Sequence, residues 1–147
     1  MRHRRTVTAL IGVATLAMTL TLAPTAQAIT RFTLTMTGAA ERPGPGDPDG
    51  SGTAVITINR GLGEVCWELE VTDITLPSIG AHIHIAPATD PGPIVVHLSP
   101  PDATGRSAGC TIVDPALAKA ITKDPAAYYV NVHTTDFPGG ALRAQLG

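Results

Sequence analysis

Hydrophobic and polar residues alternate along much of the chain from about residue 30 onward. A period of two residues is typical of a β-strand that buries one face and exposes the other. The polar positions are mostly Thr or Glu, which suits the solvent face of an antiparallel sheet. This alternation, or a shorter run of apolar residues, predicts strands at 32–37, 53–58, 65–71, 81–86, 94–98, 128–134 and 141–146.

Segments rich in Pro, Gly or Ser separate these strands. The longest predicted loop spans 38–52, and another spans 99–109. One helix is predicted over 114–121, because Asp114 suits the N-cap and Pro115 suits the first helical position. Together these elements predict an all-β fold, an antiparallel β-sandwich of about seven or eight strands with one short helix.

The start of the chain has the composition of a secretory signal peptide. A basic segment, an uncharged apolar stretch and a small-residue cleavage site follow one another at 2–5, 7–23 and 26–28. We therefore expect residues 1–28 to be removed and residues 29–147 to form one secreted or extracytoplasmic domain without a membrane span. The alternative is an uncleaved anchor, since about 17 largely apolar residues could just cross a bilayer.

The charge and the loop sequences exclude several classes of function. Three of the ten basic residues belong to the predicted leader, which leaves seven basic against twelve acidic residues and a net charge of −5. A domain without a basic patch is a poor partner for nucleic acid and for anionic membranes. The sequence has no G-x-S-x-G nucleophile elbow and no Gly-rich phosphate loop before a helix. We therefore predict no catalytic residues.

Cys66 and Cys110 are the two cysteines of the chain. Two cysteines in an exported protein usually form a disulfide, and closing a loop of about 45 residues would stabilise the fold by roughly 4 kcal/mol. Because Cys66 alternates with the apolar Val65 and Trp67, we expect the disulfide on the outward face of its sheet. Two unpaired thiols, or a metal site that combines thiolates with histidines, are the alternatives.

Polar side chains share one face of two strands that are otherwise apolar. His82 and His84 lie two residues apart, so they point to the same face at a spacing of roughly 6–7 Å. Asn131 and His133 have the same relation in the strand at 128–134. Such a face is explained by a metal site, a buried hydrogen-bond network or a ligand-binding surface.

The network interpretation is the one we favour from the residues. It predicts a polar ladder across neighbouring strands, formed by His82, His84, Asn131, His133, Arg143 and Gln145. The metal interpretation uses fewer residues, since three converging imidazoles suit copper or zinc. His97 is interpreted separately, as a surface histidine or a structural one.

Three motifs resemble the CHRD domain, a domain named for chordin that also occurs in secreted bacterial proteins. They are H-I-H at 82–84, G-P-I-V-V at 92–96, and Y-Y-V-N-V-H-T at 128–134 followed by P-G-G-x-x-R-x-Q-L at 138–146. The resemblance covers about Thr30 to Gly147. It implies an immunoglobulin-like β-sandwich with a distant similarity to copper/zinc superoxide dismutases, and no settled activity. Ala141 stands where the family often has Glu, which removes a candidate functional carboxylate.

The dismutase similarity also has implications for the histidines. Those enzymes carry an H-x-H strand, a further His, a late V-H strand and an Arg near the C-terminus, and His82, His84, His97, His133 and Arg143 occur in the same order. The loop that supplies their additional zinc ligands is missing here. The resemblance therefore implies at most one metal ion, held by His82, His84 and His133. Ring nitrogens within about 3–4 Å of one another would favour that ion, whereas rings engaged with backbone carbonyls or facing different layers would favour the network.

The leading hypothesis from the sequence is an exported, non-enzymatic β-sandwich module without a cofactor. Its role would be structural, or it would bind an unknown extracellular ligand or protein. The alternative is a mononuclear copper or zinc protein that uses His82, His84 and His133.

Overall fold

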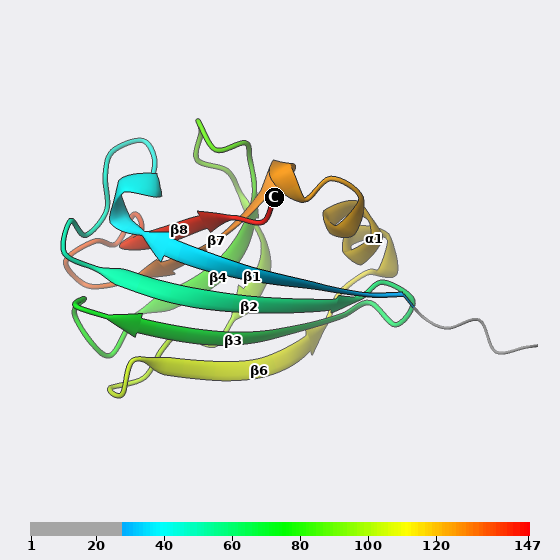
Figure 1. Ribbon diagram of the computed structural model, residues 1–147, viewed down its shortest axis with the longest axis horizontal. Coiled ribbons are helices and arrows are strands. Elements are labelled where there is room, and N and C mark those ends of the chain that lie inside the picture. Colours follow the sequence, from blue (N-terminus) through cyan, green and yellow to red (C-terminus); the bar gives the residue numbers. More distant parts are fainter. Residues whose placement is uncertain (1–27) are drawn as a thin grey trace, which may run out of the picture.

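The computed structural model describes residues 28–147 and consists of eight strands, one α-helix and two short 3-10 helices (Figure 1). The elements in chain order are β1 (Ile29–Thr37), η1 (Gly38–Ala40), β2 (Ser51–Asn59), β3 (Glu64–Thr72), β4 (Gly80–Ile85), β5 (Ile94–Leu98), β6 (Arg106–Ile112), α1 (Pro115–Lys123), η2 (Pro125–Ala127), β7 (Tyr128–His133) and β8 (Leu142–Gln145). The predicted leader lies outside the described residues except for Ala28. Within the described part, no helix is long and apolar enough to cross a membrane.

The eight strands form one antiparallel sheet in the order β5-β4-β7-β8-β1-β2-β3-β6. The sheet curls around the core until its two edge strands, β5 and β6, contact each other, so that it approaches a closed barrel. The two layers predicted from the sequence are thus parts of one continuous sheet (Figure 1). The predicted fold class is confirmed: the protein is all-β and antiparallel, with eight strands and one short helix.

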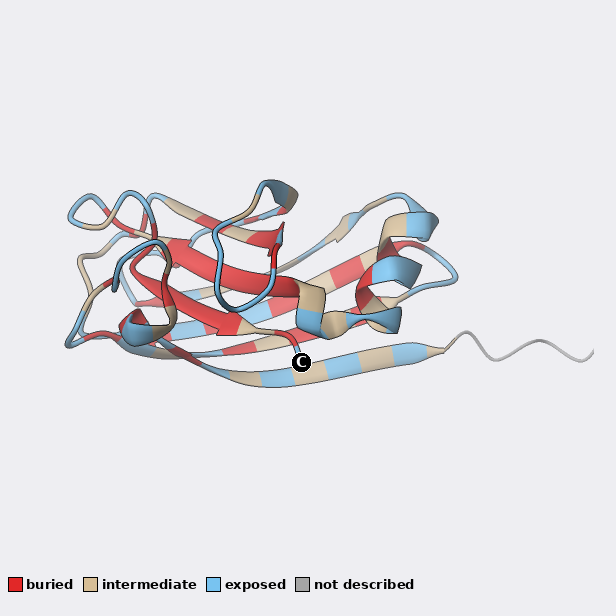
Figure 2. Cartoon of the chain, turned by 90° about the horizontal axis from the view of Figure 1, so that it is seen from above, coloured by how far each residue is buried: buried red, intermediate tan, exposed pale blue. Residues whose placement is uncertain are grey.

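Alternation decides which residues enter the core. Along β2 and β3 every second residue is buried, and Figure 2 shows buried positions alternating with more exposed ones along the long strands. Strand β7 differs, because five of its six residues are buried and it therefore lies covered on both faces. Helix α1 begins as expected: the Asp114 carboxylate accepts the N–H of Ala116, and Ile121 is fully buried against the sheet.

Strand β6 corrects the prediction of a loop over 99–109. All of Arg106–Ile112 pairs with β3, so the loop ends earlier than the sequence indicated. Gly109 lies against the indole of Trp67, where an added Cβ would be 2.6 Å from Cζ2. The sequence pattern failed here because Ser107, Ala108 and Gly109 lack the bulky residues that mark a strand. The strand is specified by its partner.

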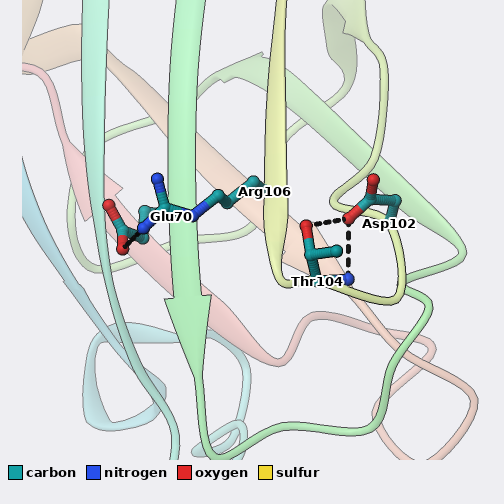
Figure 3. A network of polar contacts seen from close by, with 4 residues as sticks. All are labelled: Glu70, Asp102, Thr104 and Arg106. Atoms are coloured by element: carbon teal, nitrogen blue, oxygen red, sulfur yellow. Dashed lines mark hydrogen bonds and ion pairs between the residues drawn. The ribbon is translucent and has the colours of Figure 1, made fainter.

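Polar contacts on the solvent side hold β6 in place (Figure 3). Arg106 at the start of β6 forms an ion pair with Glu70 of β3. In the preceding turn Asp102 accepts hydrogen bonds from the backbone N–H and the hydroxyl of Thr104, which lowers the pKa of its carboxyl. These contacts are exposed, so each contributes little stability on its own.

The predicted disulfide is confirmed. Cys66 of β3 and Cys110 of β6 are direct cross-strand partners and are joined by an S–S bond of 2.10 Å. Cys66 is half-buried and Cys110 is exposed, which places the bond on the outward face of the sheet. Since both sulfurs are in the disulfide, no thiolate remains for the metal site that the sequence left open.

Candidate functional site

A row of polar residues crosses four neighbouring strands. On one side of His82 lies His97 of β5, its direct partner in the β4–β5 pair. On the other side lies Asn131 of β7, which in turn faces Arg143 of β8. Directly opposite residues of adjacent strands point to the same face, so the four side chains form a continuous row.

His84 and His133 lie beside this row and form a cluster with His82. The ring centroid of His82 is 5.0 Å from that of His133 and 5.5 Å from that of His84. The centroids of His84 and His133 are 6.1 Å apart. One ring nitrogen of each residue lies within 4.8 Å of one ring nitrogen of each of the others. Residues from β4 and β7 that are about fifty positions apart in sequence thus meet at one point.

Two of the three imidazoles are fixed by backbone carbonyls. Nδ1 of His84 is 2.8 Å from the carbonyl oxygen of Gly92, and Nδ1 of His133 is 3.0 Å from that of Pro138. Both nitrogens of His133 face oxygen acceptors, the carbonyl of Pro138 and Oδ1 of Asn131, so its one proton bonds to only one of them. A carbonyl only accepts, so the neutral ring of His84 carries its proton on Nδ1 and has its lone pair on Nε2. The carbonyl contacts are the feature expected of a polar network, and in His84 they also leave one nitrogen free to ligate, as in metal-binding histidines.

The cluster contains buried ring nitrogens without hydrogen-bond partners. Among the described residues, nothing bonds to Nδ1 of His82 or to Nε2 of His84. Nε2 of His133 is different, since it lies 3.0 Å from Oδ1 of Asn131, at hydrogen-bond distance. Because buried polar groups normally find partners, the two unpartnered nitrogens in one cluster need an explanation.

Burial keeps the cluster uncharged. The pKa of His82 is lowered to about 4, first by desolvation and then by the neighbouring His133, His84 and His97. Desolvation is also the main cause of the lowered pKa values of His84 and His133, opposed by their bonds to Gly92 and Pro138. At neutral pH the three rings are therefore neutral, which is the form that binds metals.

Beneath His84 the side chains form a stack. The ring of Tyr129 stacks parallel to that of His84, with the two centroids 4.7 Å apart. The guanidinium of Arg143 lies over the ring of Tyr129, 3.5 Å from its centroid, in a cation–π contact. The hydroxyl of Tyr129 also accepts the backbone N–H of Gly92 at 3.2 Å. The ring of His84 is thus fixed in its plane by a stacked neighbour as well as by a carbonyl.

Arg143 and Gln145 bind the loop that follows β4. Arg143 is 1% exposed and donates to the carbonyls of Pro87 and Asp90 at 2.8 and 3.0 Å, and to Oε1 of Gln145 at 3.1 Å. Gln145 donates to the carbonyl of Ala86 at 2.8 Å. Of the six residues expected in the ladder, these two donate their hydrogen bonds to backbone carbonyls and, between themselves, from Arg143 to Gln145, and they hold the loop that carries Gly92.

Glu41 is a buried residue of this region that the sequence analysis missed. Its side chain is 2% exposed and its Oε1 has no hydrogen-bond partner in the described structure. Desolvation raises the pKa of its carboxyl, against the opposing effects of Asn131 and Arg143. The carboxylate fills the space where Gly140 has no side chain, since a Cβ there would be 2.4 Å away. Glu41 lies in a Pro- and Gly-rich loop, where no alternation marks a residue as buried.

The chemistry available here is that of three neutral nitrogen donors. Ligand nitrogens 2.0–2.1 Å from a tetrahedral zinc ion lie about 3.4 Å apart. The ligand nitrogens of the three histidines lie up to 4.8 Å apart, so they must approach one another by up to about 1.4 Å to share an ion. No group suited to nucleophilic catalysis lies among these residues, and the arrangement can bind a metal or form a polar network.

Comparison with known proteins supports the motifs read from the sequence. Neither the curated proteins nor the solved structures contain a match to this chain, so the similarity to superoxide dismutases stays a prediction. The model of the CHRD domain matches residues 32–146, which is most of the chain. The match begins in β1 and ends just after β8, and it includes every residue of the histidine cluster. The protein therefore belongs to the CHRD domain family.

Proposed function

We propose that this protein is an exported, non-enzymatic binding module whose ligand is a single copper or zinc ion held by His82, His84 and His133. One observation carries the proposal. The cluster has two buried ring nitrogens without a hydrogen-bond partner, Nδ1 of His82 and Nε2 of His84, and each can offer a lone pair. A cation at the centre of the cluster would satisfy these lone pairs at once.

The donor set favours copper and zinc over other ions. Imidazole nitrogens are typical ligands of both, whereas magnesium and calcium require oxygen ligands. Copper(II) binds a given set of nitrogen donors more tightly than zinc, so it is the expected ion where both are present. The carboxylate of Glu41 is not one of the three ligands, but its negative charge in the same region would offset the charge of Arg143.

Export is supported by the chemistry of the cysteines. A disulfide between Cys66 and Cys110 is typical of an oxidising compartment, and the predicted leader would direct the chain there. Copper and zinc binding outside the cytoplasm would then take place under the same conditions in which the disulfide persists.

A structural polar ladder is the second candidate, and the row from His97 through His82 and Asn131 to Arg143 favours it. On that interpretation the histidines specify strand register and the ligand of the module is an extracellular molecule bound elsewhere. The two candidates differ in a measurable way, because only the first predicts metal at stoichiometric amounts.

The test is metal analysis of the full chain, expressed without a His tag and collected after export. The protein is stripped with a chelator, loaded with copper(II) or zinc(II), and dialysed. We expect about one equivalent of metal, and its loss in His84→Ala and in His133→Gln. His97→Gln is the matched control, since it removes an imidazole outside the triad and should keep the full equivalent. Protein that retains less than about a tenth of an equivalent after loading would overturn the proposal.

A further inference from the structure

His97 is the one histidine of the described chain that the proposed triad leaves unused. It lies on the edge strand β5, it is exposed, and no hydrogen bond involves its ring within residues 28–147. A surface residue without bonds has no evident structural role, and an edge strand accepts many residues at such a position. Its ring lies edge-on to that of His82, with the two centroids 5.0 Å apart and an interplanar angle of 87°.

We propose that His97 and His82 form an outer two-histidine metal position that captures the ion before it passes to the inner triad. This inference rests on the proposed function, since an outer position has a purpose only if the inner site binds metal. The ion is a hydrated divalent cation, copper(II) or zinc(II). The two positions share His82 as a ligand.

The geometry of the cross-strand pair supports the outer position. His82 and His97 are direct partners in the β4–β5 pair, so their side chains leave the sheet on the same face. Cβ atoms of such partners lie about 4.5–5.5 Å apart, and two imidazoles at that spacing can reach one ion from either side. His97 does not join the group whose nitrogens lie within 4.8 Å of one another. His97 thus stands apart from the triad, which makes two overlapping positions that share His82 the fitting description.

Exposure falls along the path from the outer position to the inner one. His97 is exposed, His82 and His133 are half-buried, and His84 is 6% exposed. A hydrated ion cannot reach a buried ring directly, because it must first exchange its water molecules for protein ligands. His82 contacts all three other rings, at centroid distances of 5.0, 5.0 and 5.5 Å, and is thus placed to hold the ion during the exchange.

The hydrogen bonds divide the four rings in the same way. His84 and His133 are fixed by the carbonyls of Gly92 and Pro138. His82 and His97 have no such bond in the part of the chain that the structure describes, so no carbonyl fixes their rings. Rings held by a carbonyl suit a final site, whereas rings without such a bond suit capture and transfer.

The test compares the rate of metal uptake with the affinity. Apoprotein is mixed rapidly with copper(II) or zinc(II), and binding is followed by the absorbance of copper or by a competing zinc dye. We expect His97→Gln to take up metal about tenfold more slowly while the bound stoichiometry and Kd stay unchanged. Release to excess chelator should slow by the same factor, because a residue that only lowers a barrier accelerates both directions.

Ile112→Gln is the control. It introduces the same side chain at an exposed position of β6 whose cross-strand partner is Glu64, and it keeps His97, so uptake should proceed at the rate of the unmodified protein. Uptake by His97→Gln at the unmodified rate would overturn the outer position and leave the inner site intact. A weaker Kd at an unchanged uptake rate would also overturn it, because His97 would then be a ligand of the final site. Unmodified protein that binds no metal would overturn both proposals.

Discussion

Acid should destabilise the metal-free protein through His82. The pKa of His82 is lowered from 6.5 to about 4 in the folded state, while the unfolded chain keeps the ordinary value. Between these two values the unfolded state binds a proton that the folded state does not. The free energy of unfolding is therefore retained above about pH 6.5 and falls as the pH decreases toward 4.

The size of the loss follows from the shift. At about 1.36 kcal/mol per pH unit, a shift from 6.5 to about 4 corresponds to about 3.4 kcal/mol. His82 is only half-buried, so solvent screening reduces this value, and we expect about 2 kcal/mol to be measurable. His84 and His133, whose pKa values are lowered as well, add to the loss in the same direction.

Glu41 changes the unfolding free energy with pH in the opposite direction, so the experiment must separate its contribution from that of the histidines. Burial raises the pKa of its carboxyl, so the folded state takes up a proton more readily than the unfolded one. Its contribution is favourable below the unfolded value of 4.5 and is lost as the pH rises through the folded pKa. The two effects oppose each other wherever both groups titrate, and a Glu41→Gln background removes the overlap.

The assay is urea denaturation at pH values from 7 to 4, with a chelator present so that no metal contributes. Two variants are compared: Glu41→Gln alone, and Glu41→Gln combined with His82→Gln. The variant that keeps His82 should lose more unfolding free energy as the pH falls, with a difference of about 2 kcal/mol accumulated by pH 4. Parallel curves for the two proteins across this range would refute the reasoning, since they would show that His82 titrates at its ordinary pKa in the fold.

Three further substitutions test the fold around the site. Gly109→Val should destabilise the protein by about 1–3 kcal/mol in urea denaturation, because its side chain would overlap the indole of Trp67, and an unchanged midpoint would contradict the assigned packing of β6. Replacing Cys66 and Cys110 together by Ala should cost about 2–4 kcal/mol, and reduction of the unmodified protein with dithiothreitol should give a similar loss. Arg143→Met should cost about 3 kcal/mol, since it removes two hydrogen bonds of about 1.5 kcal/mol each from a buried guanidinium to loop carbonyls, and a loss below about 0.5 kcal/mol would show that the loop does not depend on it.

How far the sequence predicts this fold depends on which force forms each strand. Strands β1, β2 and β3 bury one face each, and the alternation of apolar residues with Thr and Glu therefore marks them directly. Strand β6 has no such pattern over Arg106–Gly109, because pairing with β3 and the disulfide determine it. The alternation of apolar and polar residues indicates which side of a strand is buried. It does not mark an edge strand that forms because it pairs with the strand beside it.

The site divides in a similar way. Strand period alone places His82 with His84 and Asn131 with His133, but the distance between the two pairs depends on β4 and β7 being neighbours, which no local pattern states. Glu41 could not be found at all, because its burial is created by Gly140, a residue about a hundred positions away. Residues that come from regular strands are predictable in orientation, and residues that come from loops are predictable only once the loops are placed.

The residues that position the histidine rings distinguish the two candidate functions better than the identity of the histidines does. A polar ladder that only fixes strand register would gain most from bonds at every ring, since each unpartnered buried nitrogen costs stability. Instead, Arg143 holds the loop that positions Gly92, Gly92 fixes His84, and His82 in the centre has no bond in the described structure. A supported cluster with an unsatisfied centre contributes less stability than a fully bonded ladder would. The arrangement favours the proposed binding site, because a ligand gains affinity when the groups that meet it, here His84 in particular, are already oriented.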